Sequence, residues 1–177
     1  GPGGHSFGSF GLPSAIHAMG RAIAYIAELQ TPRFPRTTFT VGTVTGGTSV
    51  NSIAADATFA IDRRSNNSES LAVFERQAET SRWGSAAIAV SLKLIGDRPV
   101  GSTPVDSPIV QVAAGAYAKL GVDIGGITLS STDSNVPMAL GIPAITISGG
   151  GDSGGAHSPA EWFKPVNSYL GPQAVLI

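Results

Sequence analysis

The sequence contains no cysteine, which excludes disulfide bonds and thiolate metal sites, so any metal site must use histidine, aspartate and glutamate. Charged residues are also scarce, at 13% of the chain, and the formal net charge is −1. This balance gives no electrostatic reason to expect nucleic acid or a membrane surface as a partner. No apolar run approaches the ~20 residues of a transmembrane helix, and no signal peptide is visible, so a cytoplasmic protein is the default expectation.

What the sequence does contain is typical of a compact globular protein. Hydrophobic residues make up 42% of 177 residues, enough for one domain with a full core or for two small ones. The glycine-rich start at Gly1 and the apolar end at residues 174–177 suggest a piece of something longer.

The first half of the chain has the residue patterns of a helix followed by a pair of strands. Apolar residues at three- and four-residue spacings predict a helix from Pro13 to about Gln30. The segment Thr37–Val44 is β-branched and alternating, and Ser52–Ile61 alternates again after a turn at Gly46 and Gly47. The two segments therefore predict a β-hairpin-like pair.

A second helix and a further strand complete this pattern. Residues 66–68 can cap a helix through about Trp83, and Ala87–Ile95 alternates like a strand. With a missing first strand supplied, the order becomes βαββαβ, an α+β domain with two helices on one face of an antiparallel sheet. The proline-containing stretch after residue 96 then separates a first domain, residues 1–100, from residues 101–177.

Beyond the boundary, helices and strands alternate as in an α/β sheet. We expect a helix at Ile109–Leu120, a short strand at Ile127–Leu129, a helical turn at Asn135–Leu140 and a buried strand at Ile142–Ile147. These strands are too few to close a core alone, so this segment is expected to be a partial α/β domain.

The expected buried strand leads into a glycine-rich loop that ends at His157. Five glycines between residues 149 and 155 let the backbone turn tightly and approach a ligand, and Ser158-Pro159 resembles a helix start. A histidine in this place is a candidate metal ligand or general base, and Glu161 is a candidate support for its second ring nitrogen. The alternative is a surface loop with an incidental histidine.

Two further places carry candidate binding residues. His5 lies in a flexible glycine-rich segment where an imidazole can reach a ligand, and the alternative is a capped turn histidine. Arg63 and Arg64 end the second strand, and a guanidinium is a good receptor for a substrate carboxylate. The commoner alternative is two solvated arginines that pair with nearby acids. His17, inside the first helix, is interpreted as ordinary helix surface.

Five motifs, taken in order, resemble one family. They are Gly1-Pro2-Gly3-Gly4-His5-Ser6, Gly46-Gly47-Thr48-Ser49-Val50-Asn51-Ser52-Ile53, Asp62-Arg63-Arg64-Ser65, Ser131-Thr132-Asp133 and Gly155-Ala156-His157-Ser158. In this order the motifs are similar to those of zinc-dependent aminopeptidases and carboxypeptidases related to peptidase T, carboxypeptidase G and aminoacylase. The resemblance runs over nearly the whole chain, and the five motifs together are far more specific than any one alone.

The resemblance implies an architecture and a role for each site residue. Residues 1–100 would be a lid domain that makes a homodimer, and residues 101–177 the C-terminal segment of a catalytic domain that holds two zinc ions. His157 would be a zinc ligand, and His5 would stabilise the tetrahedral oxyanion, often in the partner subunit's site. Asn51 and Arg64 would hold the carboxylate or backbone of a peptide or N-acyl amino acid, and Asp133 would lie beside the metals.

The chain departs from this family in its metal ligands. It has no His-x-Asp and no Glu-Glu sequence, which supply the other ligands and the general base in the family and would belong to a segment before Gly1. We therefore expect part of a zinc peptidase or amidohydrolase that cleaves an amide bond with metal-activated water, inactive by itself. The alternative is a non-catalytic dimerisation or binding module derived from the lid.

Overall fold

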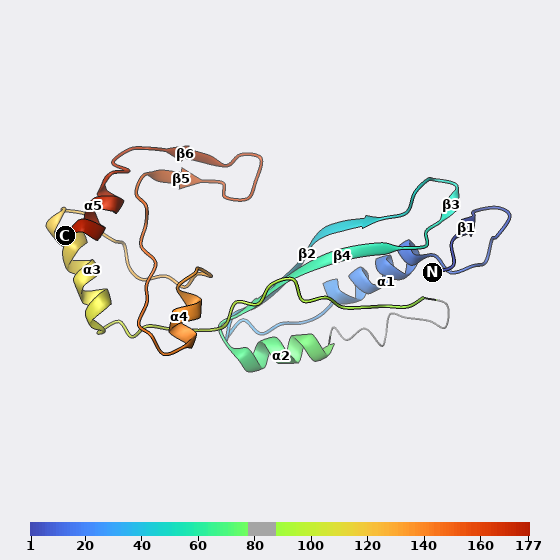
Figure 1. Ribbon diagram of the computed structural model, residues 1–177, viewed down its shortest axis with the longest axis horizontal. Helices are drawn as coiled ribbons and strands as arrows, with labels where there is room; N and C mark the ends of the chain where they lie inside the picture. The colour runs from blue at the N-terminus through green and yellow to red at the C-terminus, as the bar shows by residue number, and fades with distance from the viewer. Residues whose placement is uncertain (78–87) are drawn as a thin grey trace. The chain divides into compact units, whose positions relative to one another are not determined.

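The computed structural model describes residues 1–77 and 88–177, and the chain divides into two compact units, Gly1–Gly96 and Asp97–Ile177 (Figure 1). The first unit contains β1 (Gly4–His5), α1 (Ala15–Ala27), β2 (Thr37–Gly46), β3 (Ser52–Ile53), β4 (Ala57–Ser65) and α2 (Ser68–Gln77). The fold is therefore the mixed α+β class that the sequence predicts. None of the described helices is long and apolar enough to cross a membrane.

Helix α1 forms where the apolar spacing predicts it, although it ends at Ala27. The Ser14 hydroxyl accepts a hydrogen bond from the His17 backbone N–H at 3.5 Å and so caps the first turn. The buried positions are Ala15, Ala18, Ala22 and Ile26. Three of these four are alanines, whose small side chains let the helix lie close to the sheet.

Strands β2 and β4 form the predicted antiparallel pair. The register runs from Thr37 opposite Ser65 to Gly46 opposite Ala57, with an irregularity between Val41 and Thr43. The predicted single strand from Ser52 to Ile61 is instead split into β3 and β4, and β3 pairs antiparallel with β1.

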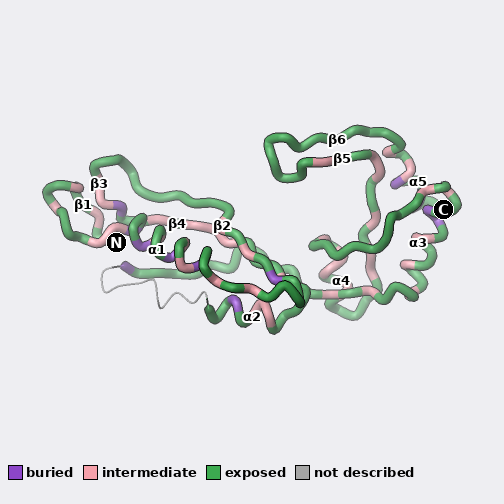
Figure 2. The backbone as a smooth tube through the Cα atoms, turned by 180° about the vertical axis from the view of Figure 1, so that it is seen from behind, coloured by how far each residue is buried: buried purple, intermediate pink, exposed green. Residues whose placement is uncertain are grey.

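Both helices pack on one face of this pair. Ile26 of α1 and Phe74 of α2 are buried, and around them lie Leu29, Phe39, Val41, Phe59 and Ile61. The Phe39 and Phe74 rings stack with centroids 5.0 Å apart. Figure 2 shows buried residues along α1 and on α2, with the strands between intermediate and exposed. This core fixes the sheet against the helices, and on its other face Thr38 and Thr40 of β2 are exposed.

The end of the first unit differs from the sequence prediction. The Asn67 side chain accepts a hydrogen bond from the Ser70 N–H at 2.9 Å and caps α2, as predicted. The predicted helix end near Trp83 lies outside the described residues. Ile88 alone makes a bridge, and residues 89–95 form no strand. Residues 89–95 are all exposed, with Leu92 at 72%, so the alternating sequence pattern there marks no buried face.

The second unit is built around helices. It contains α3 (Pro108–Lys119), α4 (Asn135–Ala139), β5 (Asp152–Gly154), β6 (Trp162–Lys164) and α5 (Leu170–Leu176). Helices α3 and α4 lie where the sequence predicts them. Ala116 and Tyr117 of α3 are buried with Ala174 of α5, and Leu120, Val122 and Ile147 pack around them.

The two predicted strands of this unit are wrong. Residues 127–129 and 142–147 adopt no strand in the structure, and Leu129 and Ile142 are exposed. A strand requires a neighbour for its backbone groups, and no such neighbour lies beside these segments in the described part of the chain. At Ala144 a side chain substitutes for the neighbour, because the Thr103 hydroxyl accepts from the Ala144 N–H at 3.0 Å and donates to its carbonyl at 2.6 Å.

Candidate functional site

Two distant motifs meet at one end of the first unit. Strand β1 pairs with β3, with Gly4 opposite Ile53 and His5 opposite Ser52. The Ser6 N–H donates to the Asn51 carbonyl at 2.9 Å. Residues 4–6 and 48–53, called here the β1–β3 tip, therefore bring two predicted site residues, His5 and Asn51, onto neighbouring backbone.

The imidazole of His5 is held by its own loop. Its Nδ1 accepts hydrogen bonds from the backbone N–H groups of Phe7 and Gly8, both at 3.3 Å. This is the capped-turn arrangement that was the alternative to a functional histidine. The two readings are compatible, because an imidazole that accepts at Nδ1 carries its proton on Nε2 when neutral. The cap leaves Nε2 available as a donor.

The Asn51 carboxamide is held by a hydroxyl. The Ser49 hydroxyl donates to Asn51 Oδ1 at 2.8 Å. The backbone around the pair is fixed by Ser52, whose hydroxyl donates to the Ser49 carbonyl at 2.9 Å and accepts from the Ser49 N–H at 3.3 Å. The acceptor atom Oδ1 of Asn51 is therefore already hydrogen-bonded, as is the acceptor atom Nδ1 of His5.

Arg64 is not part of this tip. It pairs in register with Thr38, near the start of β2, whereas the loop that carries Asn51 follows the other end of β2 at Gly46. The seven residue-to-residue steps from Ala57 to Arg64 span about 23 Å at the ~3.3 Å rise of a strand. Figure 1 shows the same separation, with β1 and β3 at one end of the long β2–β4 pair and α2 at the other.

The two arginines point to opposite faces of the sheet. Arg63 shares the helix-covered face with Ile61 and forms an ion pair with Glu75 of α2, at 2.6 Å. Arg64 is on the opposite face and donates through Nε to Asp62 at 2.8 Å. Both arginines therefore pair with nearby acids, as the alternative interpretation expected. Of the two arginines, Arg64 is the one on the face opposite the helices.

In the second unit, His157 lies in the turn of a short hairpin rather than before a helix. Strands β5 and β6 pair with Asp152 opposite Lys164, and the turn between them contains Ser158 and Pro159, so the predicted helix start is wrong. The Ser158 hydroxyl donates to the Gly155 carbonyl at 2.7 Å, which closes a tight turn in its place. His157 adopts the left-handed conformation there, with φ of 61°.

The predicted partners of His157 have other contacts. Glu161 Oε2 accepts from the His157 backbone N–H at 3.3 Å, so the bond made is to the backbone and not to the ring. Asp133 Oδ1 accepts a hydrogen bond from Arg98 Nη2 at 3.1 Å. Arg98 Nη1 also donates to the Ser131 hydroxyl at 3.3 Å. Within residues 1–77 and 88–177, no group of three or more histidines, aspartates and glutamates could hold a metal ion.

The comparison with protein families decides what the first unit is. Residues 1–81 match the M20_dimer family, described as the peptidase dimerisation domain. This segment, called here the dimerisation domain, covers less than half of the chain. The β1–β3 tip, the β2–β4 pair and both helices fall within this matched segment.

Solved structures show the same fold over nearly the whole chain. A tripeptidase from Staphylococcus aureus subsp. aureus Mu50 has a TM-score of 0.59 and 22% identity, covering 98% of this chain and 47% of its own. The aminopeptidase PepT from Bacillus cereus ATCC 10987 has a TM-score of 0.55 and 23% identity, covering 98% and 46%. The chain therefore spans about half the length of the solved structures it matches. No curated protein matches the sequence.

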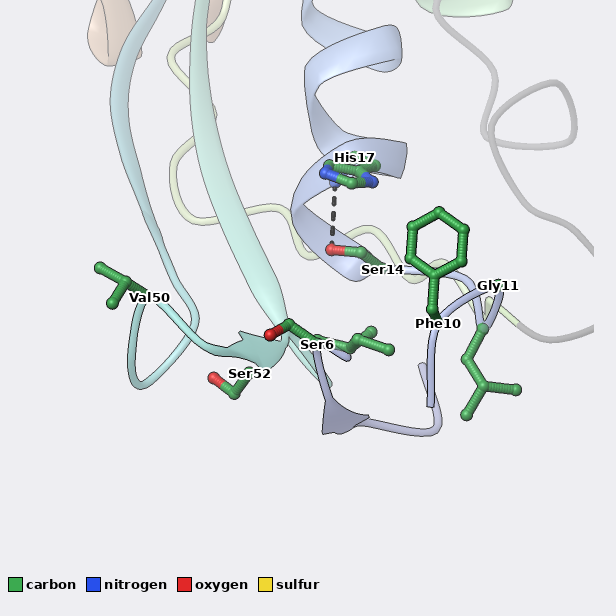
Figure 3. Close-up of a pocket in the computed structure, with 9 residues that line it drawn as sticks. Ser6, Phe10, Gly11, Ser14, His17, Val50 and Ser52 are labelled. Atoms are coloured by element: carbon green, nitrogen blue, oxygen red, sulfur yellow. Dashed lines mark hydrogen bonds between the residues drawn. The ribbon is translucent and has the colours of Figure 1, made fainter. Parts of the chain in front are cut away.

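A pocket of about 480 Å³ opens beside the tip of the dimerisation domain (Figure 3). It is lined by Ser6, Phe10, Gly11, Leu12, Ser14, His17, Val50, Ser52 and Ile53. His17 is exposed on α1, as predicted, and it also contributes to the wall of this pocket, which the sequence did not indicate. The sequence feature that could have indicated this is the position of His17, in the first turn of α1 directly after the loop that carries His5.

Proposed function

We propose that this chain supplies the dimerisation domain and part of the catalytic domain of a zinc-dependent, cytoplasmic peptidase or amidohydrolase that cleaves a peptide or N-acyl amino acid. The observation that carries the proposal is the joining of His5 and Asn51 by β1–β3 pairing inside a segment that matches the peptidase dimerisation domain. The similar structures, a tripeptidase and an aminopeptidase, support amide hydrolysis as the reaction.

In this proposal His5 donates a hydrogen bond to the oxygen that becomes negative during amide hydrolysis. The amides of Phe7 and Gly8 donate to Nδ1, so the neutral imidazole carries its proton on Nε2. A donor that is already oriented stabilises a developing oxyanion without reorganising at the moment of reaction. Asn51 donates through its Nδ2 to another oxygen of the same substrate.

Arg64 has a separate part in the proposal. Its guanidinium binds a carboxylate of the substrate in exchange for Asp62, which now occupies Nε. Because Arg64 lies at the other end of the β2–β4 pair from the tip, one dimerisation domain cannot grip a small substrate with both. We propose that the tip and Arg64 serve different active sites of a homodimer, with His5 acting in the partner subunit's site.

In this proposal the whole enzyme binds zinc, and this chain supplies only part of the site. His157 is the proposed zinc ligand, and Asp133 and Glu161 are proposed neighbours. The described residues do not fit a complete zinc site, because they include no cluster of three suitable side chains and Asp133 is paired with Arg98. Two zinc ions would therefore need ligands from outside these residues.

One experiment separates this proposal from the alternative, a dimerisation or binding module without catalysis, which the dimerisation-domain match also suits. The coding sequence upstream of Gly1 is read, and any protein containing His-x-Asp and Glu-Glu motifs is expressed with this chain and assayed on di- and tripeptides with zinc. The proposal expects zinc-dependent hydrolysis that His157→Ala abolishes. Hydrolysis that survives His157→Ala, or an upstream sequence without these motifs, would favour the module.

A further inference from the structure

Three hydroxyl groups form a hydrogen-bonded cluster beside Asn51, those of Thr48 and Ser49 in the loop before β3 and that of Ser52 at the start of β3. Thr48 Oγ1 lies 3.1 Å from Ser52 Oγ, and Ser49 Oγ lies 3.2 Å from the same atom. Ser49 Oγ also lies 2.8 Å from Asn51 Oδ1. Which hydroxyl donates to which acceptor determines which atoms of Asn51 remain available for a ligand.

Each hydroxyl has a single proton to donate, and the distances assign it. The Ser52 proton goes to the Ser49 carbonyl, at 2.9 Å. The Ser49 proton goes to Asn51 Oδ1, which at 2.8 Å is nearer than Ser52 Oγ at 3.2 Å. The carboxamide oxygen of Asn51 is thereby held toward the loop, and its NH₂ group, with two donors, is left without a partner in the loop.

We infer that Ser49 is a positioning residue, which fixes the Asn51 carboxamide so that Nδ2 rather than Oδ1 meets the substrate. The inference rests on the proposed role of Asn51 as a donor to a substrate oxygen. A carboxamide flips between donor and acceptor faces at little cost when nothing holds it. An oxygen turned toward a carboxylate would repel it, so a fixed orientation raises affinity for anionic oxygen.

The chain offers a set of serine variants that tests the inference. Ser49→Ala removes the hydroxyl, Ser49→Thr keeps it, and Ser68→Ala removes an exposed serine at the start of α2 as a matched control. The first readout is the ¹³C shift of Asn51 Cγ, which reports hydrogen bonding to Oδ1 and requires no ligand. The second is the affinity for acetate as a carboxylate probe, followed at the Asn51 Nδ2 protons in the full chain.

Ser49→Ala is expected to move the Cγ shift and to weaken acetate binding about two- to tenfold, the scale of one lost hydrogen bond. Ser49→Thr and Ser68→Ala are expected to match the wild type, and all three variants should keep its melting temperature. A Ser49→Ala protein with wild-type Cγ shift overturns the inference. A loss of acetate affinity that Ser49→Thr shares, or that accompanies a fall in melting temperature, also overturns it.

Failure of the proposed function looks different. If acetate leaves the wild-type Asn51 protons unshifted while the Cγ shift still changes in Ser49→Ala and recovers in Ser49→Thr, Ser49 positions Asn51 as inferred. The donor role of Asn51 toward a carboxylate is then what fails.

Discussion

The side chains of His5, Asn51 and Arg64 each already have a local partner, and that partner determines what each can offer a substrate. Phe7 and Gly8 occupy Nδ1 of His5, and Ser49 occupies Oδ1 of Asn51, so both residues keep their donor groups. Arg64 differs, because its own donor Nε is engaged by Asp62. It must exchange this exposed partner for a substrate, and exposed pairs of this kind contribute little stability.

These differences predict separate kinetic effects in the complete enzyme. His5 meets an oxygen whose charge develops only in the transition state, so His5→Ala is expected to lower kcat by about 10²- to 10³-fold, as for loss of one oxyanion donor. Arg64 binds a carboxylate whose charge hardly changes, so Arg64→Ala is expected mainly to raise KM. Steady-state kinetics measures both.

The control for these substitutions is Arg21→Ala, an exposed arginine on α1 outside the tip and the β2–β4 pair. It is expected to leave both constants unchanged. A His5→Ala enzyme with normal kcat and raised KM would show that His5 only binds substrate.

At the residue scale, the sequence names candidate site residues but does not describe their contacts. The motif order identified His5 and Asn51 without showing that β1 and β3 pair, because that pairing joins residues about fifty positions apart. For His157, the Ser158-Pro159 pair resembled a helix start. Its actual turn depends on the distant pairing of β5 with β6, which no local pattern reports.

At the scale of elements, local signals were reliable and long-range pairing was not. Helices α1, α3 and α4 lie as predicted because apolar spacing and end signals act within a few turns. The strands predicted at 127–129 and 142–147 fail because alternation and apolar runs describe a strand that has neighbours. The structure supplies no neighbouring strand there among its described residues, so these segments form no strand.

Two glycines in the long β2–β4 pair offer a matched test of that element. A Cβ on Gly46 would lie 2.8 Å from both Cα and Cβ of Ala57, on the paired strand, whereas a Cβ on Gly42 meets nothing within 4 Å. Gly46→Ala is therefore expected to destabilise the domain by about 1–3 kcal/mol, the usual cost of overpacking. Gly42→Ala is expected to change stability by less than about 1 kcal/mol.

Urea unfolding of both variants, followed by far-UV circular dichroism, makes the comparison. Equal stabilities for Gly46→Ala and Gly42→Ala would contradict the close approach of β2 and β4 at their ends.

For the whole molecule, the dimerisation domain predicts self-association. The β2–β4 pair has only two strands among the described residues, so it presents unpaired backbone groups that recruit another chain. Together with the family match, this predicts a homodimer or larger assembly of the 177-residue chain at micromolar concentration. Sedimentation equilibrium measures the mass directly, and a clean monomer would count against the proposed role.

Zinc binding by the 177-residue chain tests the central claim, that this chain carries a dimerisation domain and only part of a zinc site. His157 is a single candidate ligand, and the described residues hold no cluster to complete its coordination. Since zinc requires several ligands in defined geometry, isothermal titration calorimetry is expected to show weak, non-stoichiometric binding that His157→Ala weakens further. One tight equivalent of zinc per chain would contradict the account.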